Sequence, residues 1–238
     1  MKTSRLFLSL PPLLQEKLRP LVRMRHFQAG EMIFLQEDPS EAIYFVEEGR
    51  VKIARVSPEG EETILCIRHP GEYFCPVPLL DGKGQLGTAF ALTPVTILSI
   101  ERQVFLELAR EHPELLAIVQ ADCLKEVRYL LHRLEAFSRF SVRERVISGL
   151  LDALQPASEN RAIVWLTHQE LANLIGASRE NVSRTLKELE KEGLIRLCRG
   201  KIEILNVPQL SARLSVPREP LPMLCMRNER THLAIADR

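Results

Sequence analysis

The segment from residue 166 to residue 189, LTHQELANLIGASRENVSRTLKEL, predicts two short helices joined by a tight turn. Thr167 and Glu170 have the T-x-x-E spacing of a capping box, which begins the first helix. Gly176 supplies the positive φ that a tight helix exit needs, and Ser178 is suited to cap the second helix. Because so few residues join the helices, the segment predicts the layout of a helix-turn-helix.

The second helix has one apolar face and one charged face. Val182, Leu186 and Leu189 recur at i, i+4 and i+7, which is the stripe of a helix packed on a core. The polar face holds Arg179, Glu180, Ser183, Arg184 and Lys187. An ordinary helical hairpin with a solvated face would show the same pattern, so the residues that follow decide between the two.

After Gly193, apolar residues alternate with polar ones through Ile204, which predicts a β-hairpin around Arg199-Gly200-Lys201. Such a wing after a helix pair favours a winged helix-turn-helix, whose second helix enters the DNA major groove. The charge distribution agrees with phosphate contact. Residues 139–238 contain 16 Lys/Arg and 12 Asp/Glu, against 16 and 19 in residues 1–138.

Residues 26–106 consist of short apolar runs separated by glycine turns. In one run, Val51 and Ile53 alternate with Lys52 and Ala54, as in a strand with one buried face. Many short strands at regular spacing predict a closed all-β roll or barrel.

His112-Pro113 begins a long helix that is predicted to continue through Phe137. Its apolar positions recur every three to four residues and are wide enough to pack on the roll and on a second copy of the chain. A single buried helix would show the same periodicity. The residues predicted to form a dimer contact are Leu116, Cys123, Val127, Leu130, Leu134 and Phe137.

The chain of 238 residues is long enough for two modest domains. Leu6–Leu14 is apolar, but Pro11-Pro12 interrupts it and no cleavage site follows, so no secretion signal is predicted. No apolar run has the length of a membrane span, and the five cysteines form no C-x-x-C pair. We therefore expect a cytoplasmic protein with no membrane partner.

Four motifs give the chain a resemblance to a known family. They are F-x-x-G-E at Phe27–Glu31, Glu48-Gly49, P-G-E at Pro70–Glu72, and Arg179-Glu180-x-x-Ser183-Arg184. In this order they resemble the β-roll and recognition helix of the cyclic AMP receptor protein / fumarate-nitrate reductase regulator (CRP/FNR) family of transcriptional regulators. The resemblance covers roughly residues 5–210, and several motifs in order are more specific than any single one.

The resemblance implies an α+β fold in four parts. They are an N-terminal double-stranded β-helix (jelly-roll-like) sensor domain at 1–111, a dimerisation helix at 112–137, a winged helix-turn-helix at 138–214 and a tail at 215–238. It also implies a homodimeric regulator that binds double-stranded DNA at an inverted repeat with a TGA-like half-site. RNA polymerase is a further expected partner if the protein activates transcription.

The resemblance also implies roles for the DNA-binding residues. Glu180 would accept from cytosine and Arg184 would donate to guanine, while Arg179 would add a guanine contact and Ser183 a thymine or phosphate contact. Residues expected near phosphates, or on the same polar face, are Thr167, His168, Gln169, Ser178, Lys187, Arg199 and Lys201.

The sensory pocket is predicted to involve Gly71, Glu72, Cys75, Gln85, Leu86 and Tyr129. Members that bind cyclic AMP need an Arg-Ser or Arg-Thr pair for the buried phosphate, but Gln85-Leu86 stands there, and Lys83 is the only cation between Arg68 and Arg102. Cyclic AMP is therefore not expected, and Gly71-Glu72 is interpreted as a turn. An iron–sulfur cluster is excluded because the first 65 residues contain no cysteine.

Haem is an alternative effector, because Phe74-Cys75 resembles the ligand turn of the haem-containing members, although Val77 stands where their histidine would be. Cys75 would be the haem ligand, with His26 or His69 as a second ligand. The commoner role of a free cysteine such as Cys75 is that of a small buried apolar residue. A thiol switch between Cys66 and Cys75 is a further alternative.

A different class of function also fits a β-roll, namely a regulatory subunit that binds a protein partner. The C-terminal winged helix-turn-helix argues against it. No enzyme is predicted, because the sequence shows neither a nucleophile–base arrangement nor a metal-ligand spacing.

Overall fold

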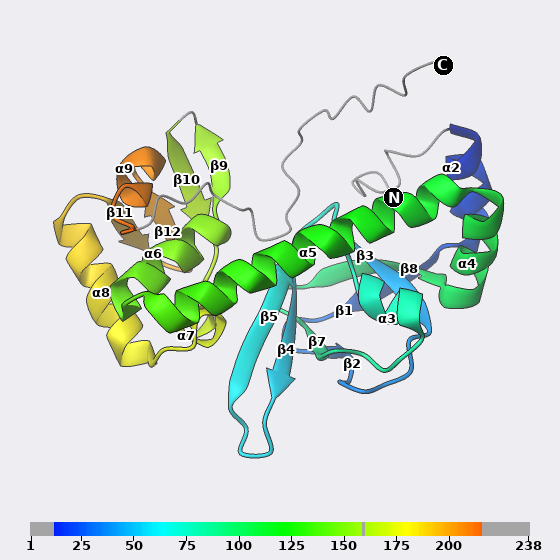
Figure 1. Cartoon of the computed structure of the whole chain (residues 1–238), viewed down its shortest axis with the longest axis horizontal. Helices are drawn as coiled ribbons and strands as arrows, with labels where there is room; N and C mark the ends of the chain where they lie inside the picture. Colours follow the sequence, from blue (N-terminus) through cyan, green and yellow to red (C-terminus); the bar gives the residue numbers. More distant parts are fainter. Residues whose placement is uncertain (1–11, 159, 216–238) are drawn as a thin grey trace.

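The computed structural model describes residues 12–158 and 160–215. It confirms the predicted α+β class: a long helix, α5 (Pro113–Arg139), runs diagonally past a β-roll and ends in a smaller domain of helices and strands (Figure 1). Among the described residues, no helix is long and apolar enough to cross a membrane.

The roll consists of two antiparallel four-stranded sheets, as the predicted double-stranded β-helix requires. The first sheet has the order β1 (Arg23–Phe27), β8 (Val95–Glu101), β3 (Ala42–Glu48) and β6 (Tyr73–Phe74). The second has the order β2 (Met32–Phe34), β7 (Thr88–Ala91), β4 (Val51–Val56) and β5 (Glu62–Arg68).

Strand β8 shows why its sequence is an almost continuous apolar run. Val95 and Ile97 point into the core between the two sheets, whereas Leu98 and Ile100 belong to a second core under the helices. Because successive side chains of a strand point to opposite faces, a strand covered on both sides is apolar at nearly every position.

Three helical segments of the roll were not assigned in the sequence. They are η1 (Arg19–Leu21), α3 (Pro76–Asp81) and α4 (Arg102–Glu111), and a further helix, α2 (Pro12–Leu18), precedes them. α3 follows Cys75, which adopts a left-handed conformation with φ of +64°, and Pro76 then occupies the first helical turn. Short helices such as α3 lack the repeated periodicity that identifies longer ones.

The C-terminal domain contains α6 (Val142–Asp152), α7 (His168–Ile175), α8 (Arg179–Lys191) and α9 (Val207–Ser211). Its sheet has the order β11 (Ile195–Cys198), β12 (Lys201–Ile204), β10 (Arg161–Val164) and β9 (Gln155–Ser158). The hairpin β11–β12 confirms the predicted wing. Strands β9 and β10 were not predicted from the sequence. In β9, a short edge strand, a proline removes the strand signal.

The two domains share one hydrophobic core. Ala54, Ile64 and Ile67 of β4 and β5 pack with Tyr129 of α5 and with the core of the C-terminal domain. Helix α5 continues two residues beyond its predicted end, and Ser141 then caps α6 through a capping box with Glu144. The tail predicted at 215–238 lies outside the described residues, apart from Ser215.

Candidate nucleic-acid interface and sensor cavity

The helix-turn-helix has the local geometry that the sequence predicts. Thr167 Oγ1 accepts a hydrogen bond from Glu170 N at 3.1 Å, and Thr167 N donates to the Glu170 carboxylate at 2.6 Å. Gly176 ends α7 with φ of +61°, and Ser178 caps α8 by accepting from Asn181 N at 3.3 Å. These caps fix the angle between α7 and α8.

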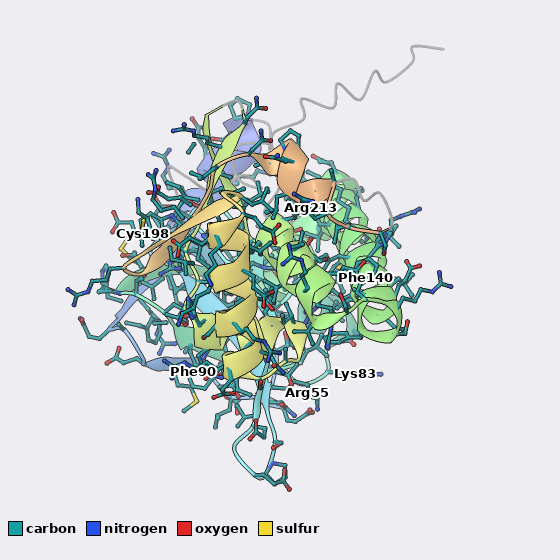
Figure 2. All side chains as sticks on the ribbon, turned by 90° about the vertical axis from the view of Figure 1, so that its left-hand side faces the viewer. Arg55, Lys83, Phe90, Phe140, Cys198 and Arg213 are labelled. Atoms are coloured by element: carbon teal, nitrogen blue, oxygen red, sulfur yellow. The ribbon has the colours of Figure 1, made fainter. Side chains whose placement is uncertain are left out.

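Helix α8 shows the two faces expected of a reading helix. Val182, Leu186 and Leu189 are fully buried against the domain core. The exposed residues of the predicted polar face are Arg179, Glu180, Arg184 and Lys187. Glu180, Arg184 and Lys187 are spaced i, i+4 and i+7, so they share one side of the helix. Figure 2 shows α8 along the face nearest the viewer, with the wing strand that ends at Cys198 beside it.

Two side chains of the predicted set are held by neighbours. His168 Nδ1 lies 2.9 Å from Ser183 Oγ, which ties the start of α7 to the middle of α8. Partial burial, reinforced by Arg179 and Lys187, lowers the pKa of His168 below its usual 6.5. The imidazole is therefore neutral at pH 7 in the absence of DNA.

Asn181 is a residue of this surface that the sequence reasoning missed. Arg184 Nη2 donates to Asn181 Oδ1 at 2.8 Å, so the guanidinium is partly oriented before any DNA is present. The i, i+3 spacing on a predicted helix was the available signal.

The outer residues of the predicted interface differ in their surroundings. Gln169 Nε2 donates to Asn173 Oδ1 at 2.7 Å within α7. Arg199 is exposed at the tip of the wing, whereas Lys201 is 2.7 Å from the Glu203 carboxylate and lies over the Trp165 ring at 5.9 Å. The Glu203 carboxylate would therefore compete with a phosphate for Lys201.

A cavity of about 150 Å³ lies between the roll and α5. Cys75 and Leu86 line it, as predicted for the sensory pocket. Its other lining residues are Ile53, Leu65, Cys66, Arg68, Phe74, Pro76, Val77, Pro78, Gly87, Cys123, Glu126, Val127 and Leu130.

Four predicted pocket residues do not line this cavity. Gly71 and Glu72 form a turn, in which the Glu72 carboxylate accepts from His69 N at 2.8 Å. Gln85 is buried beside the 37–38 loop, with which its backbone forms hydrogen bonds. Tyr129 faces the shared core with the C-terminal domain.

The cationic side chain that lines the cavity is Arg68, whereas the sequence suggested Lys83 as the nearest cation. Arg68 Nη2 donates to Glu126 Oε1 at 2.8 Å, and the two side chains are 5% and 22% exposed. An arginine within the apolar run of β5 was the signal for this residue, because such a residue is buried only with a partner.

The residues around Cys75 do not fit haem. His26 Nδ1 lies 3.1 Å from Thr96 Oγ1, His69 Nδ1 lies 2.7 Å from Gln155 Nε2, and neither histidine lines the cavity. Burial raises the pKa of the Cys75 thiol well above its usual value, which opposes the thiolate that iron requires. The volume is also below the roughly 300–1,000 Å³ of pockets for drug-sized ligands, and haem is at least that large.

The predicted dimer stripe of α5 divides into two parts. Leu116 and Cys123 are partly buried and pack against the core under the helices. The exposed part consists of Leu124, Val127, Leu130, Leu131, Leu134 and Phe137. Periodicity alone could not separate the positions that face the roll from those that face away from it.

Comparisons with known proteins agree with this architecture. The Cyclic nucleotide-binding domain family matches residues 24–112, and the Crp-like helix-turn-helix domain family matches residues 144–213. The Cyclic AMP receptor protein of Thermus thermophilus is 33% identical over 204 residues, covering 86% of this chain and 94% of that protein. The Global nitrogen regulator of Synechococcus elongatus is 28% identical, covering 82% and 90%.

Solved structures show the same fold. A CRP/FNR family transcriptional regulator from Thermus thermophilus is 27% identical with a TM-score of 0.59, covering 80% of this chain and 97% of that one. FixK2 from Bradyrhizobium japonicum has a TM-score of 0.72 at 22% identity, covering 79% and 95%. The motifs, the fold and these relatives together show that the chain belongs to the CRP/FNR family of DNA-binding transcriptional regulators.

Proposed function

We propose that the protein acts as a homodimer that reads an inverted repeat with a TGA-like half-site, switched by a signal sensed in the β-roll. The observation that carries this proposal is the exposed face of α8, where Glu180, Arg184 and Lys187 project from one side of a helix buried on the other. A carboxylate accepts from cytosine N4, and a guanidinium donates to guanine O6 and N7.

The surrounding residues would fix the register of α8 on the duplex. The N-terminus of α7 and the exposed Arg199 of the wing flank the reading face, where backbone N–H groups and cations suit phosphates. Ser183 would contact DNA only through a change at His168, with which it is already in contact.

The second copy of the chain is proposed to cover the exposed part of the α5 stripe. Isolated exposed leucines are ordinary, but six large apolar residues along one helix form a continuous surface, with Leu124 66% and Leu134 65% exposed. Pairing α5 with its symmetry mate would place the two α8 helices about one helical turn of DNA apart. RNA polymerase would be a further partner of an activator, and a cytoplasmic location stays a prediction.

A thiol switch is the weaker explanation for the signal. Burial raises the pKa of Cys66 to about 11, and that of Cys75 rises for the same reason. Both groups are then protonated at neutral pH, and the thiol is a poor nucleophile compared with the thiolate.

Dimerisation and DNA binding can be tested together. Replacing Leu131 and Leu134 by glutamate places charges in the proposed contact, so sedimentation should show monomers and affinity for an inverted repeat should fall more than tenfold. Glutamate at His132, an exposed residue of α5 that lies on a different side of the helix from the stripe, is the matched control and should leave both unchanged. A double variant that stays dimeric would contradict the proposed contact.

A further inference from the structure

We infer that the signal sensed by the roll is a small, uncharged, mainly apolar molecule of about the size of one aromatic ring, held in the cavity between β5, α3 and α5. This inference rests on the proposed function, because it names the ligand class of the proposed sensor. This cavity differs from a nucleotide-binding site in its charge, its polarity and its volume.

The charge of the cavity is already balanced. Arg68 and Glu126 are the only charged side chains among its lining residues, and they form an ion pair with each other. An anionic ligand on Arg68 would displace Glu126, and a cationic ligand on Glu126 would displace Arg68. Either exchange breaks a mostly buried ion pair, which is strongly unfavourable. A neutral ligand avoids that exchange.

The remaining walls have few polar groups to offer. Aliphatic side chains, the Phe74 ring, two prolines and the sulfur atoms of Cys66, Cys75 and Cys123 form them. Thiols are weak hydrogen-bond donors and behave as small polarisable apolar groups. A ribose or a phosphate would lose its water here without receiving equivalent hydrogen bonds.

The volume limits the size of the occupant. An engineered apolar cavity of about 150 Å³ in another protein binds benzene, whereas pockets for larger organic ligands begin at roughly 300 Å³. The cavity of this chain has the smaller value, 150 Å³. One ring with a short substituent therefore fits without moving the walls.

The position of the cavity suggests how a bound ligand would change DNA binding. Cys123, Val127 and Leu130 contribute the α5 wall, and the last two also belong to the exposed stripe proposed to meet the second copy. Leu86, which is half exposed, also lines the cavity, from the loop before β7. An occupant that contacts both the roll and α5 would hold α5 at one distance from the roll and bias one arrangement of the dimer.

The test uses the full-length protein and four probes: toluene, benzoate, cyclic AMP and naphthalene. Toluene should bind saturably in calorimetry and raise the melting temperature, with benzoate at least tenfold weaker and cyclic AMP without effect. Val77→Phe, which fills the cavity from α3, should weaken toluene binding at least tenfold. Leu86→Ala, which enlarges the cavity, should retain toluene and improve naphthalene binding at least fivefold.

Other outcomes overturn the inference. Benzoate or cyclic AMP binding more tightly than toluene would reject the uncharged class. If Val77→Phe does not fold, the Leu86→Ala variant decides. A relative affinity for naphthalene over toluene that is unchanged from the wild type would reject the cavity as the site. The DNA affinity measured beside each titration separates the two proposals. Toluene binding that leaves DNA affinity unchanged would contradict its role as the signal, while tight DNA binding without any toluene binding would reject only the ligand class.

Discussion

Arg68 on β5 and Glu126 on α5 form a mostly buried ion pair, with Nη2 and Oε1 2.8 Å apart. The pair joins the roll to the long helix at the edge of the cavity, in a place where neither charge is well solvated. Arg133, about two turns further along α5, makes a second polar link to β5 through a backbone carbonyl.

Replacing Glu126 alone should destabilise the protein more than replacing both partners. Glu126→Met removes the carboxylate that accepts from the buried Arg68 Nη2, at an expected cost of about 1–3 kcal/mol in the free energy of unfolding. The double variant Arg68→Met/Glu126→Met should recover most of this loss, because it replaces both charges of the pair by apolar side chains. Urea unfolding measures both. A double variant less stable than either single variant would contradict this account.

Replacing Arg133 should loosen the C-terminal domain from the roll. Its guanidinium donates to the carbonyl oxygens of Leu65 at 3.0 Å and Leu174 at 2.5 Å, and so bridges β5 and α7. Arg133→Met should raise amide hydrogen exchange in both segments at least tenfold, because the bridge is lost while α5 stays helical. Arg128→Met, an exposed site on the same helix, is the control. Unchanged exchange at residues 171–176 would show that the bridge does not hold the domain.

Gly176→Ala should be more damaging than the same change at Gly193. Both glycines have positive φ, at +61° and +71°, so each alanine adds backbone strain of about 1–2 kcal/mol. At Gly176 the new Cβ would also lie 2.6 Å from a Phe137 ring atom, while at Gly193 nothing lies within 4 Å. The extra loss of stability in Gly176→Ala, measured by thermal unfolding, is the free energy needed to move the Phe137 ring. Equal losses at the two sites would exclude that contact.

DNA affinity should increase as pH falls through the lowered pKa of His168. The folded-state pKa lies below the usual 6.5, so the free protein holds the neutral imidazole at pH 7 and gains a positive charge only in more acidic solution. The same shift means that His168 makes folding less favourable as pH falls below 6.5, since the unfolded state takes up the proton first. Phosphates near α7 would favour the charged form.

Fluorescence anisotropy between pH 7.5 and 5.5, at constant salt, measures this effect. His168→Gln keeps a polar group beside Ser183 but cannot take up the proton, so the part of the pH dependence due to His168 should disappear. The same slope in the variant would assign the protonation to another group.

The local signals of the C-terminal domain were strong because each acts over a few residues. The capping box at Thr167, the turn at Gly176 and the cap at Ser178 are present where the spacing predicts them. The apolar stripe of α8 is buried as expected. Caps and turns depend on near neighbours in the chain, so sequence spacing predicts them well.

The sensor cavity depended on contacts that no local pattern shows. Arg68 and Glu126 are 58 residues apart in the chain, and only the packing of α5 on β5 brings them together. The Phe74-Cys75 motif correctly predicted that Cys75 lines the pocket. Gly71, Glu72, Gln85 and Tyr129 were predicted to line it too, but the fold places them elsewhere. The two sides of α5 were likewise indistinguishable until the roll was in place.

We predict that α8 reads DNA through Glu180. A competition assay in which each base of a TGA-containing inverted repeat is varied, for the wild type and for Glu180→Ala, tests this role. Lys187→Ala is the matched control, because loss of a phosphate contact weakens all sequences alike. Glu180→Ala should abolish discrimination at one base pair of each half-site, worth about 1–3 kcal/mol, while discrimination elsewhere is kept. A Glu180→Ala variant with the base preferences of the wild type would show that Glu180 does not read the DNA sequence.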